Sequence, residues 1–314
     1  MAIVTIGFNP AIDRILECPD FHLGRHQEVR QIARLAAGKA ANVSRALALL
    51  GTDSIATGFV GTNEIEFFLD QLMSISPGRV LCHFVEVSGK TRENISILDP
   101  KRRVETHLRD RGFVVDSAEV SLLEERLRHD VRAGDVAIFA GSLCAGLTQA
   151  CFEKLIDACA GRGARVVVDS SGDPLKVACR HKLWLVKPNL DELRDLIGHE
   201  VPNAASAVRD AAREVLPNVE HVLVSRGAAG AVLVTPAGAW SSRIPMNDPV
   251  VRTVGCGDHL LAGFIAEEMI GRDPEAAFRA AVAVATARAQ SPDMAEFDPN
   301  LARTLLGKVE IEKI

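Results

Sequence analysis

The most constraining feature of this chain is a regular alternation of short apolar runs with longer amphipathic stretches. Runs rich in aliphatic and β-branched residues, typical of strands, occupy residues 2–6, 54–60, 80–87, 135–141, 164–170, 183–188 and 221–227. Several of them lack an inside/outside alternation, which indicates a parallel sheet covered on both faces. Residues 42–51, 147–163 and 204–216 have the pattern of amphipathic helices, and the first two of these end in glycine. The alternation predicts an α/β fold with a doubly wound, mostly parallel sheet flanked by helices.

Two segments interrupt this alternation. Residues 12–36 and 89–108 are rich in charge and alternate polar with apolar residues, as half-exposed antiparallel strands do. We expect these two insertions to form a small β-sheet lid over one end of the main sheet, although two ordinary surface hairpins would give the same pattern. The main domain would then comprise residues 1–11, 37–88 and 109–314.

Composition and charge narrow the class of protein. The 314 residues are 47% hydrophobic and 25% charged, which is enough to bury a sizeable core. The formal net charge is −5, so the chain lacks the excess of basic residues that a general nucleic-acid binder needs. No apolar stretch is long enough to cross a bilayer, and the N-terminus lacks the features of a signal peptide. The seven cysteines are odd in number and include no C-x-x-C pair, so we expect a reducing, cytoplasmic location without disulfides or a zinc site.

The stretch TVGCGD, residues 253–258, followed by an apolar helical run, is the strongest candidate for chemistry. Gly255 and Gly257 let the backbone approach a ligand closely, and a helix start offers unpaired N–H groups and a positive dipole end. Such a site suits a phosphate. The carboxylate of Asp258 could accept a proton from a hydroxyl beside it, although capping a helix is an equally common task for aspartate.

Two further stretches border the predicted strands and helices, where open α/β sheets bind their ligands. AAGKAANVSRAL places Gly38 and Lys39 before a helix with Asn42 in its first turn, and the spacing is not that of a P-loop. VKPNLDEL combines Asn189 with Glu192, either as a capping box or with Glu192 near Mg²⁺ through water.

Two other stretches carry weaker signals. SRGAAG, residues 225–230, could offer backbone amides to phosphates or form a glycine-rich turn. In GKTREN, Arg92 could grip a phosphate through two parallel hydrogen bonds, although most arginines in such strands are simply solvated.

In this order, the stretches resemble the phosphofructokinase B family of the ribokinase superfamily, particularly its bacterial 1-phosphofructokinases and tagatose-6-phosphate kinases. The motifs are NPAIDR, AGKAANVSRAL, TREN, GSL, WLVKPNLDEL and TVGCGD, which span nearly the whole chain. The resemblance implies a ribokinase-like fold, with a main domain for nucleotide and substrate and a β lid through which a homodimer could form. It implies a kinase that uses ATP and Mg²⁺ to phosphorylate fructose 1-phosphate or, as alternatives, tagatose 6-phosphate or fructose 6-phosphate.

The resemblance also implies roles for individual residues. Asp258 would deprotonate the sugar hydroxyl beside an anion hole formed by Gly255, Cys256 and Gly257. The sugar would be held by Asp13, Gly38 and Asn42, and its existing phosphate by Lys39, Arg92 and Ser142. The nucleotide side would comprise Lys187, Asn189, Ser225, Gly227 and Gly230, and Glu192 would be tied to the metal.

The chain departs from the family pattern at three single positions, and GSLCAG at residues 141–146 replaces the usual GSLP run. Cys256 stands where the family usually has alanine, His259 where it has serine, and Ala40 where it has a glycine with a freer backbone. Cys256 would fill space or, if the helix start lowers the pKa of its thiol, be reactive. His259 would be a plain polar residue or would add a proton-dependent charge.

Two rival functions remain open at this point. A non-catalytic sugar-phosphate sensor would keep the fold and lose turnover. The charged candidates are all present and count against it: Asp258, Lys39, Arg92 and Glu192. A nicotinamide-dependent dehydrogenase would need a G-x-G-x-x-G motif after the first strand, and the chain has GFNPAID there.

Overall fold

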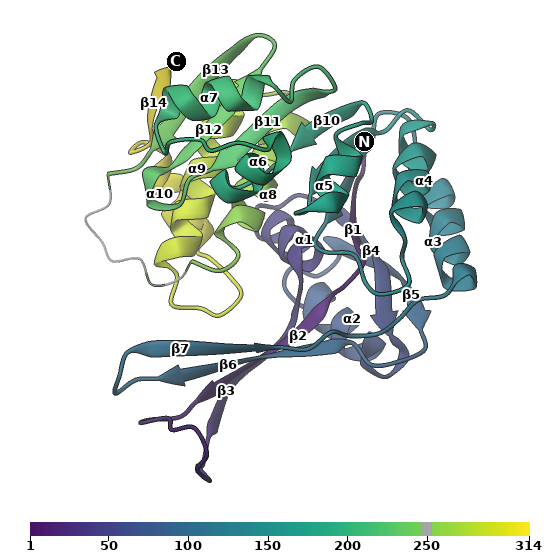
Figure 1. Ribbon diagram of the computed structural model, residues 1–314, viewed down its shortest axis with the longest axis vertical. Helices are drawn as coiled ribbons and strands as arrows, with labels where there is room; N and C mark the ends of the chain where they lie inside the picture. Colours follow the sequence, from purple (N-terminus) through teal and green to yellow (C-terminus); the bar gives the residue numbers. More distant parts are fainter. Residues whose placement is uncertain (246–250, 252) are drawn as a thin grey trace.

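The computed structural model describes residues 1–245, 251 and 253–314. A ten-stranded sheet forms the centre of the molecule, in the order β14-β13-β12-β11-β10-β9-β8-β1-β4-β5 (Figure 1). Its parallel strands are β1 (Ile3–Gly7), β4 (Ser54–Gly61), β5 (Val80–Val87), β8 (Val136–Ala140), β9 (Arg165–Asp169), β10 (Leu183–Val186) and β11 (Val219–Ser225). Each coincides with a run that the sequence predicted, so the mostly parallel α/β sheet is confirmed.

Three strands at one edge were not predicted. β12 (Ala231–Thr235), β13 (Gly238–Arg243) and β14 (Glu310–Lys313) continue the sheet in antiparallel fashion. β13 is only partly buried, and β14 is largely exposed, so neither has the continuous apolar run that marks the parallel strands.

Helices cover both faces of this sheet. One layer contains α1 (Lys39–Leu49), α2 (Ile65–Met73), α8 (Cys256–Met269), α9 (Pro274–Gln290) and α10 (Pro299–Leu306). The other contains α3 (Ser117–Asp130), α4 (Gln149–Ala160), α5 (Asp173–Ala178), α6 (Leu190–Ile197) and α7 (Ala205–Arg213). Short 3₁₀ turns span Thr62–Glu64 (η1) and Gly227–Ala229 (η2). Because both faces are covered, strands such as β8 are buried along their whole length.

Helix α8, which begins in the TVGCGD stretch, is packed unusually closely against α9. A Cβ atom on Gly263 would lie only 2.9 Å from the Cα of Ala281, so the two helices meet backbone to backbone at this point. The contact packs α8 tightly against α9. Within the described residues, no helix is both long and apolar enough to span a membrane.

A second, four-stranded sheet projects from the main body (Figure 1). Its strands, in spatial order, are β3 (Arg30–Ala37), β2 (Ala11–Glu17), β6 (Arg92–Asp99) and β7 (Val104–Arg109). The outer pairs are antiparallel as expected, but the central pair, β2 with β6, is parallel. The prediction that all strands of the small sheet pair in antiparallel fashion was therefore wrong. β2 and β6 leave the main sheet directly after β1 and β5, and those two strands point the same way.

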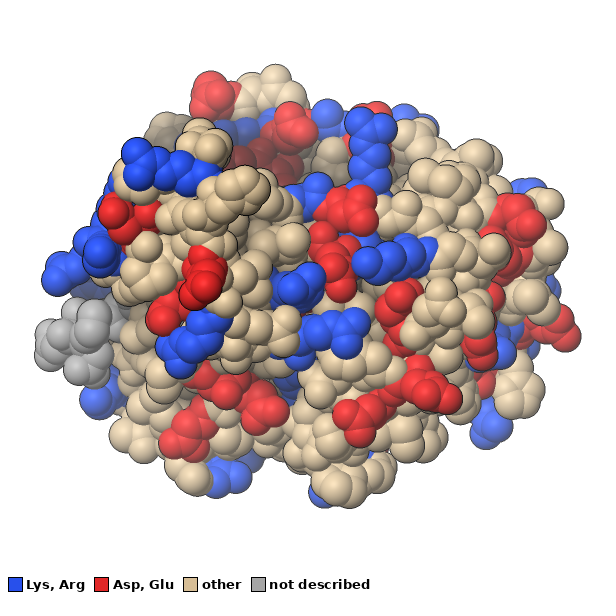
Figure 2. All heavy atoms as spheres, turned by 90° about the horizontal axis from the view of Figure 1, so that it is seen from below, with Lys and Arg blue, Asp and Glu red and all other residues tan. Residues whose placement is uncertain are grey.

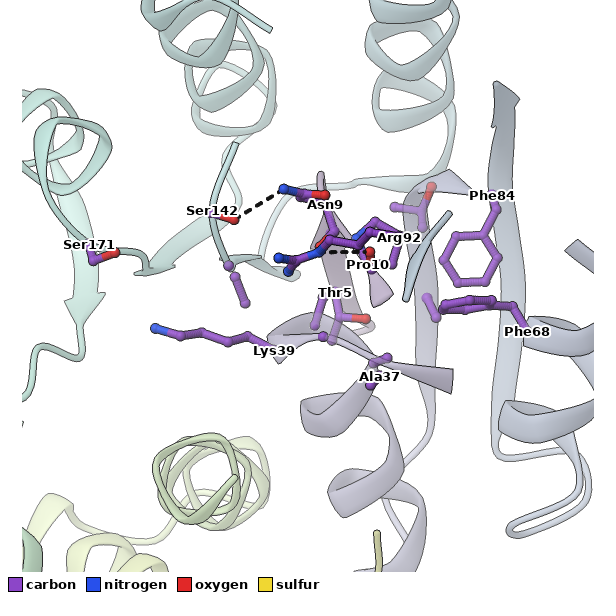
Figure 3. Close-up of a pocket in the computed structure, with 18 of the residues that line it drawn as sticks. Thr5, Asn9, Pro10, Ala37, Lys39, Phe68, Phe84, Arg92, Ser142 and Ser171 are labelled. Carbon is purple, nitrogen blue, oxygen red and sulfur yellow. Dashed lines mark hydrogen bonds between the residues drawn. The ribbon is translucent and has the colours of Figure 1, made fainter. Parts of the chain in front are cut away.

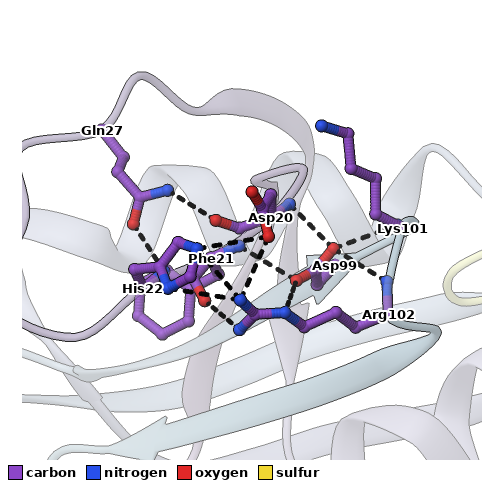
Figure 4. Close-up of polar contacts among 7 residues, drawn as sticks. All are labelled: Asp20, Phe21, His22, Gln27, Asp99, Lys101 and Arg102. Atoms are coloured by element: carbon purple, nitrogen blue, oxygen red, sulfur yellow. Dashed lines mark hydrogen bonds and ion pairs between the residues drawn. The ribbon is translucent and has the colours of Figure 1, made fainter.

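The far end of this small sheet is held together by Asp99 (Figure 4). Its carboxylate accepts backbone N–H bonds from Asp20 and Phe21 at 2.9 Å, and from Lys101 and Arg102 at 3.0 and 3.2 Å. Burial acts to raise the pKa of this carboxyl, but the four donors together lower it. The connection between β2 and β3 is thereby tied to the turn between β6 and β7.

Candidate active site

The candidate site is a cavity of about 490 Å³ between the carboxyl edge of the main sheet and the small sheet (Figure 3). This volume is in the range of small-molecule sites. Among the predicted site residues, it is lined by Gly38, Lys39, Arg92, Ser142, Asn189 and Glu192.

A second, smaller hollow adjoins this cavity, since Ala37 lines both. It is lined by three more predicted residues, Asp13, Asn42 and Gly255. The predicted sugar and phosphate residues, which come from distant parts of the sequence, are thus brought together. The other predicted residues line neither hollow: Cys256, Gly257, Asp258, Lys187, Ser225, Gly227 and Gly230.

Asp258 lies directly behind the smaller hollow. The N-cap of α8 is Gly255, in the left-handed region with φ 81°, so Asp258 stands in the first helical turn and does not cap the helix. Its carboxylate accepts a 2.7 Å hydrogen bond from Nδ2 of Asn42. The Oδ1 of Asn42 accepts in turn from the buried guanidinium of Arg45 at 3.1 Å. Arg45 therefore fixes the orientation of the amide that contacts Asp258.

The surroundings of Asp258 prepare it to accept a proton near neutral pH. Burial, together with the nearby carboxylate of Asp169, raises the pKa of Asp258 to about 6, while Asn42, Lys187 and Lys39 act in the opposite direction. A carboxylate with such a pKa is ionised at pH 7 and is a stronger base than an ordinary aspartate.

Asp169 is a central residue of the site that the sequence interpretation missed. It is fully buried at the end of β9, where its two oxygens pair with Lys39 Nζ at 2.8 Å and Lys187 Nζ at 3.1 Å. Burial acts to raise the pKa of Asp169, but the two ammonium groups outweigh it and hold the pKa below its ordinary value. A signal was present, because this carboxylate ends a buried parallel strand, where α/β sheets place functional groups.

The ammonium group of Lys187 lies against the start of α8. A Cβ atom on Gly257 would come within 3.1 Å of Lys187 Nζ, so the absence of a side chain at 257 makes room for the lysine. A positive charge and the N-terminal end of a helix therefore meet at one point. This combination is suited to an anion.

Arg92 lies on the side of the cavity formed by the small sheet (Figure 3). Its Nε and an Nη atom donate to the backbone carbonyls of Pro10 and Asn9, at 3.2 and 2.9 Å. The side-chain amide of Asn9 donates to Ser142 Oγ at 3.4 Å. Asn9 and Arg109 line the cavity as well and were not predicted. On the face seen in Figure 2, basic and acidic side chains are interspersed. Anion binding therefore depends on local basic groups such as Arg92 and Arg109, which line the cavity.

Glu192 acts as a capping residue in this structure. Its carboxylate accepts from the backbone N–H of Asn189, and the Asn189 side chain accepts from that of Glu192, each at 2.8 Å. The other oxygen of Glu192 lies 3.9 Å from Lys39 Nζ, and the residue lines the cavity. In the described part of the chain, no group of three or more His, Cys, Asp or Glu could hold a metal ion. A Mg²⁺ ion here would take most of its ligands from water and phosphate, which is its usual behaviour.

The glycines of the predicted nucleotide loop have explanations in the backbone. A Cβ atom on Gly230 would overlap the carbonyl oxygen of Ser242, and Gly227 has a φ of 59°. Ser225 pairs with Asn189 through an isolated parallel bridge, which joins this loop to the start of α6. The contact of Ser225, Gly227 and Gly230 with a nucleotide stays a prediction.

Two hypotheses about the unusual residues are wrong. Burial raises the pKa of the Cys256 thiol, so the helix start does not produce a reactive thiolate. Burial lowers the pKa of His259 to about 3, and its Nδ1–H donates to the Gly255 carbonyl at 2.8 Å. His259 is therefore neutral at pH 7 and holds the turn before α8. Ala40 lies within α1, where the backbone freedom of glycine is not required.

Comparison with known proteins decides the family. A family model described as pfkB family carbohydrate kinase matches residues 3–300. The chain belongs to this family. The resemblance inferred from the motifs is confirmed, and the protein is a carbohydrate kinase by membership.

Individual relatives of this PfkB family chain cover nearly its whole length. The 1-phosphofructokinase of Bacillus subtilis is 31% identical over 312 residues, which are 99% of this chain and 100% of that protein. The tagatose-6-phosphate kinase of Staphylococcus epidermidis is 30% identical over 264 residues, 83% of each chain. Phosphofructokinase-2 of Escherichia coli, solved in complex with substrates and products, has a TM-score of 0.91 at 25% identity, with 98% of this chain and 99% of that chain covered. Another structure of that enzyme is described as its tetrameric inhibited form. The ribokinase-like fold is thus confirmed.

Proposed function

We propose that the protein is an ATP- and Mg²⁺-dependent kinase that phosphorylates a ketohexose already carrying one phosphate, foremost fructose 1-phosphate. One observation supports this proposal above all. A buried aspartate with a raised pKa stands at the start of α8 behind the smaller hollow, and the arginine-bearing cavity adjoins that hollow. The site therefore has a base for a hydroxyl and, at a distance from it, positive charge for a phosphate.

Asp258 carries the proton transfer in this proposal. Its carboxylate removes the proton from the sugar hydroxyl as the oxygen attacks the γ-phosphorus of ATP. The new P–O bond forms while the bond to the β,γ-bridging oxygen breaks, and ADP leaves. Asn42 and Arg45 keep the carboxylate oriented, through the bonds at 2.7 and 3.1 Å. The product from fructose 1-phosphate is fructose 1,6-bisphosphate.

The start of α8 stabilises the phosphoryl group during transfer. Phosphoryl transfer requires positioning and charge stabilisation more than covalent chemistry from the protein. Both requirements are met at the start of α8. The positioning and the positive charge come from the N–H groups of Gly255, Cys256 and Gly257 and from the ammonium of Lys187, which lies against Gly257. Asp169 holds Lys187 there and holds Lys39 beside it.

Mg²⁺ would neutralise charge on the ATP phosphates, with Glu192 reaching it through water. Glu192 lines the cavity and lies 3.9 Å from Lys39, so its carboxylate is near the proposed phosphates. Asn189, Ser225, Gly227 and Gly230 complete the proposed nucleotide side.

Tagatose 6-phosphate and fructose 6-phosphate are the alternative acceptors. A tagatose-6-phosphate kinase is 30% identical to this chain, only slightly less than the first-named 1-phosphofructokinase. All three sugars offer one phosphate and one free terminal hydroxyl, so the same residues could serve each of them.

We also propose that the small sheet, residues 12–36 and 89–108, acts as a separate lid domain and forms a homodimer interface. Val104 and Leu108 on β7 are 54% and 52% exposed, which leaves apolar surface on this sheet. A cytoplasmic location is consistent with seven cysteines that form no disulfide in the described chain.

A phosphosugar panel with coupled detection of ADP tests the activity. We expect ADP release that requires ATP, Mg²⁺ and a phosphoketohexose, and is fastest with fructose 1-phosphate. Binding of a phosphosugar without ADP release would favour the non-catalytic sensor. Release with unphosphorylated fructose at the same rate would contradict the proposed substrate class.

A further inference from the structure

Glu64 is a buried acidic residue that none of the roles assigned so far uses. It stands in the 3₁₀ turn η1, directly after β4, and is only 7% exposed. Within the described part of the chain, its carboxyl group has no ion pair with a lysine, arginine or histidine. Glutamate is seldom buried in this way, because an unpaired acidic group is costly to remove from water. Its place in the fold therefore calls for a specific task.

The carboxyl group of Glu64 is bonded to the segment that carries the chain from the main sheet to the small sheet. This crossing segment, residues 88–91, links β5 to β6. Oε2 of Glu64 accepts a 2.8 Å hydrogen bond from the backbone N–H of Thr91. Oγ1 of the fully buried Thr91 accepts in turn from the backbone N–H of Gly61, the last residue of β4, at 2.9 Å. The end of β4 and Thr91 are thus joined by two bonds that run in opposite directions.

The packing around these two bonds leaves the crossing segment little room. A Cβ atom on Gly61 would lie 2.6 Å from Oε2 of Glu64, 2.6 Å from the carbonyl oxygen of Gly89 and 2.7 Å from the backbone nitrogen of Thr91. On its other side, a Cβ atom on Gly89 would lie 3.2 Å from the Cβ of Phe113. The crossing segment is therefore held from two sides, and Glu64 supplies the polar contact on one of them.

The residue that follows Thr91 is Arg92, which begins β6 and lines the cavity. Its guanidinium donates to the carbonyls of Asn9 and Pro10, which connect β1 to β2. Arg92 is thus fixed at its tip by one connection between the two sheets. Through Thr91, its backbone is fixed by the other connection, so the position of the guanidinium depends on both.

We propose that Glu64 is a positioning residue, which acts through Thr91 to hold Arg92 where the sugar phosphate binds. This inference rests on the proposed function, which gives Arg92 that task. Without Glu64, the N–H of Thr91 would be a buried donor that lacks its acceptor, and the crossing segment would loosen. Glu64 does not line the cavity, so its loss should weaken binding of the phosphosugar more than it slows the chemical step.

The experiment compares Glu64→Ala and Glu64→Gln with a matched control, Glu66→Ala. Glu66 is exposed on α2, carries the same charge two residues away and makes no side-chain hydrogen bond or ion pair with the described residues. Each change is made in the wild type and in Arg92→Ala, and initial rates are measured with fructose 1-phosphate and ATP varied separately. Hydrogen exchange followed by mass spectrometry reports the crossing segment without any need for turnover.

We expect Glu64→Ala to raise KM for fructose 1-phosphate roughly three- to tenfold, the scale of coupling between residues of one contact network. The same change in Arg92→Ala should add little, because the group that Glu64 positions is already gone. Exchange in the crossing segment should become roughly tenfold faster or more, as expected for the loss of a buried hydrogen bond. KM for ATP should change little, Glu64→Gln should recover most of the loss because it keeps an acceptor oxygen, and Glu66→Ala should match the wild type.

An equal rise of KM in the wild type and in Arg92→Ala, or an equal rise for ATP, would show that Glu64 does not act through Arg92, and the proposed function would stand. Unchanged exchange in the crossing segment would contradict the anchor itself. If Glu64→Ala does not fold, Thr91→Val, which removes only the hydroxyl that accepts from Gly61, repeats the same comparison with the same expected outcome. If the wild type phosphorylates no phosphosugar, the proposed function fails, and the role of Glu64 in the reaction fails with it, whatever the exchange shows.

Discussion

The two ends of the site treat charge in opposite ways. Around Asp258, nearly every charged group already has a partner in the protein: Asp169 is fully buried between two lysines, and Asn42 contacts Asp258. At the lid end, Arg92 bonds only to neutral carbonyls, and the Arg109 side chain lines the cavity without a hydrogen bond or ion pair among the described residues. We call these regions the floor and the lid end.

The difference indicates a division of labour. Groups that are paired and buried before substrate arrives cost little reorganisation during the reaction, which is what transition-state stabilisation needs. Unpaired arginines at a solvent-accessible wall gain most of their stabilisation when an anion binds. Changes in the floor should therefore lower kcat, and changes at the lid end should raise KM for the sugar phosphate.

The largest effect should come from the base. Asp258→Asn keeps the size of the side chain and removes the proton acceptor, so we expect kcat to fall by roughly 10²- to 10⁴-fold. Binding of ATP, measured by calorimetry, should be almost unchanged. A variant with near-normal turnover would remove Asp258 from its assigned role.

A smaller loss is expected from Gly257→Ala. The added methyl group would lie 3.1 Å from Lys187 Nζ and push the ammonium away from the start of α8. We expect kcat to fall by about 100-fold, the effect of losing one preorganised donor. Gly307→Ala is the matched control, because a Cβ atom at Gly307 meets no atom within 4 Å. Equal kcat values for the two variants would show that Lys187 does not serve the reaction at this place.

Arg92→Ala tests the lid end. Loss of a charge-assisted contact should raise KM for the phosphosugar by roughly tenfold or more and leave KM for ATP close to that of the wild type. Initial rates with each substrate varied in turn give both constants. A variant that loses kcat without a change in KM would break the division between floor and lid end.

The pH dependence of the wild type should show the mildest effect. Since the pKa of Asp258 is raised to about 6, the carboxylate gains a proton as the pH falls through 6 and ceases to be a base. We expect kcat/KM to be about halved near pH 6 and to drop about tenfold per pH unit below it. A profile that stays flat down to pH 4.5 would contradict the raised pKa.

The sequence predicted the parallel part of the fold because buried strands such as β8 are continuous apolar runs. It did not predict β14, which is mostly exposed and depends on pairing with β13. The parallel pairing of β2 with β6 is likewise a long-range property, set by the directions of β1 and β5.

The site was predictable where a residue stands in a local motif. Gly38, Lys39 and Asn42 start a helix, and Gly255 and Asp258 start another, so glycine and polar residues are visible together in the sequence. Arg109 gives no such signal, because it is one of several charged residues on an exposed strand. Its position opposite Asn94 depends on the register of β6 with β7, which follows from folding alone.

The most direct test of the account is ³¹P NMR of the wild-type protein with ATP, Mg²⁺ and fructose 1-phosphate. The account predicts that the γ-phosphate signal of ATP disappears as the signals of ADP and of a second sugar phosphomonoester grow in equal amounts. The Asp258→Asn variant should leave the spectrum unchanged over the same time. Conversion of ATP to ADP and inorganic phosphate alone, or no conversion with any phosphoketohexose, would contradict it.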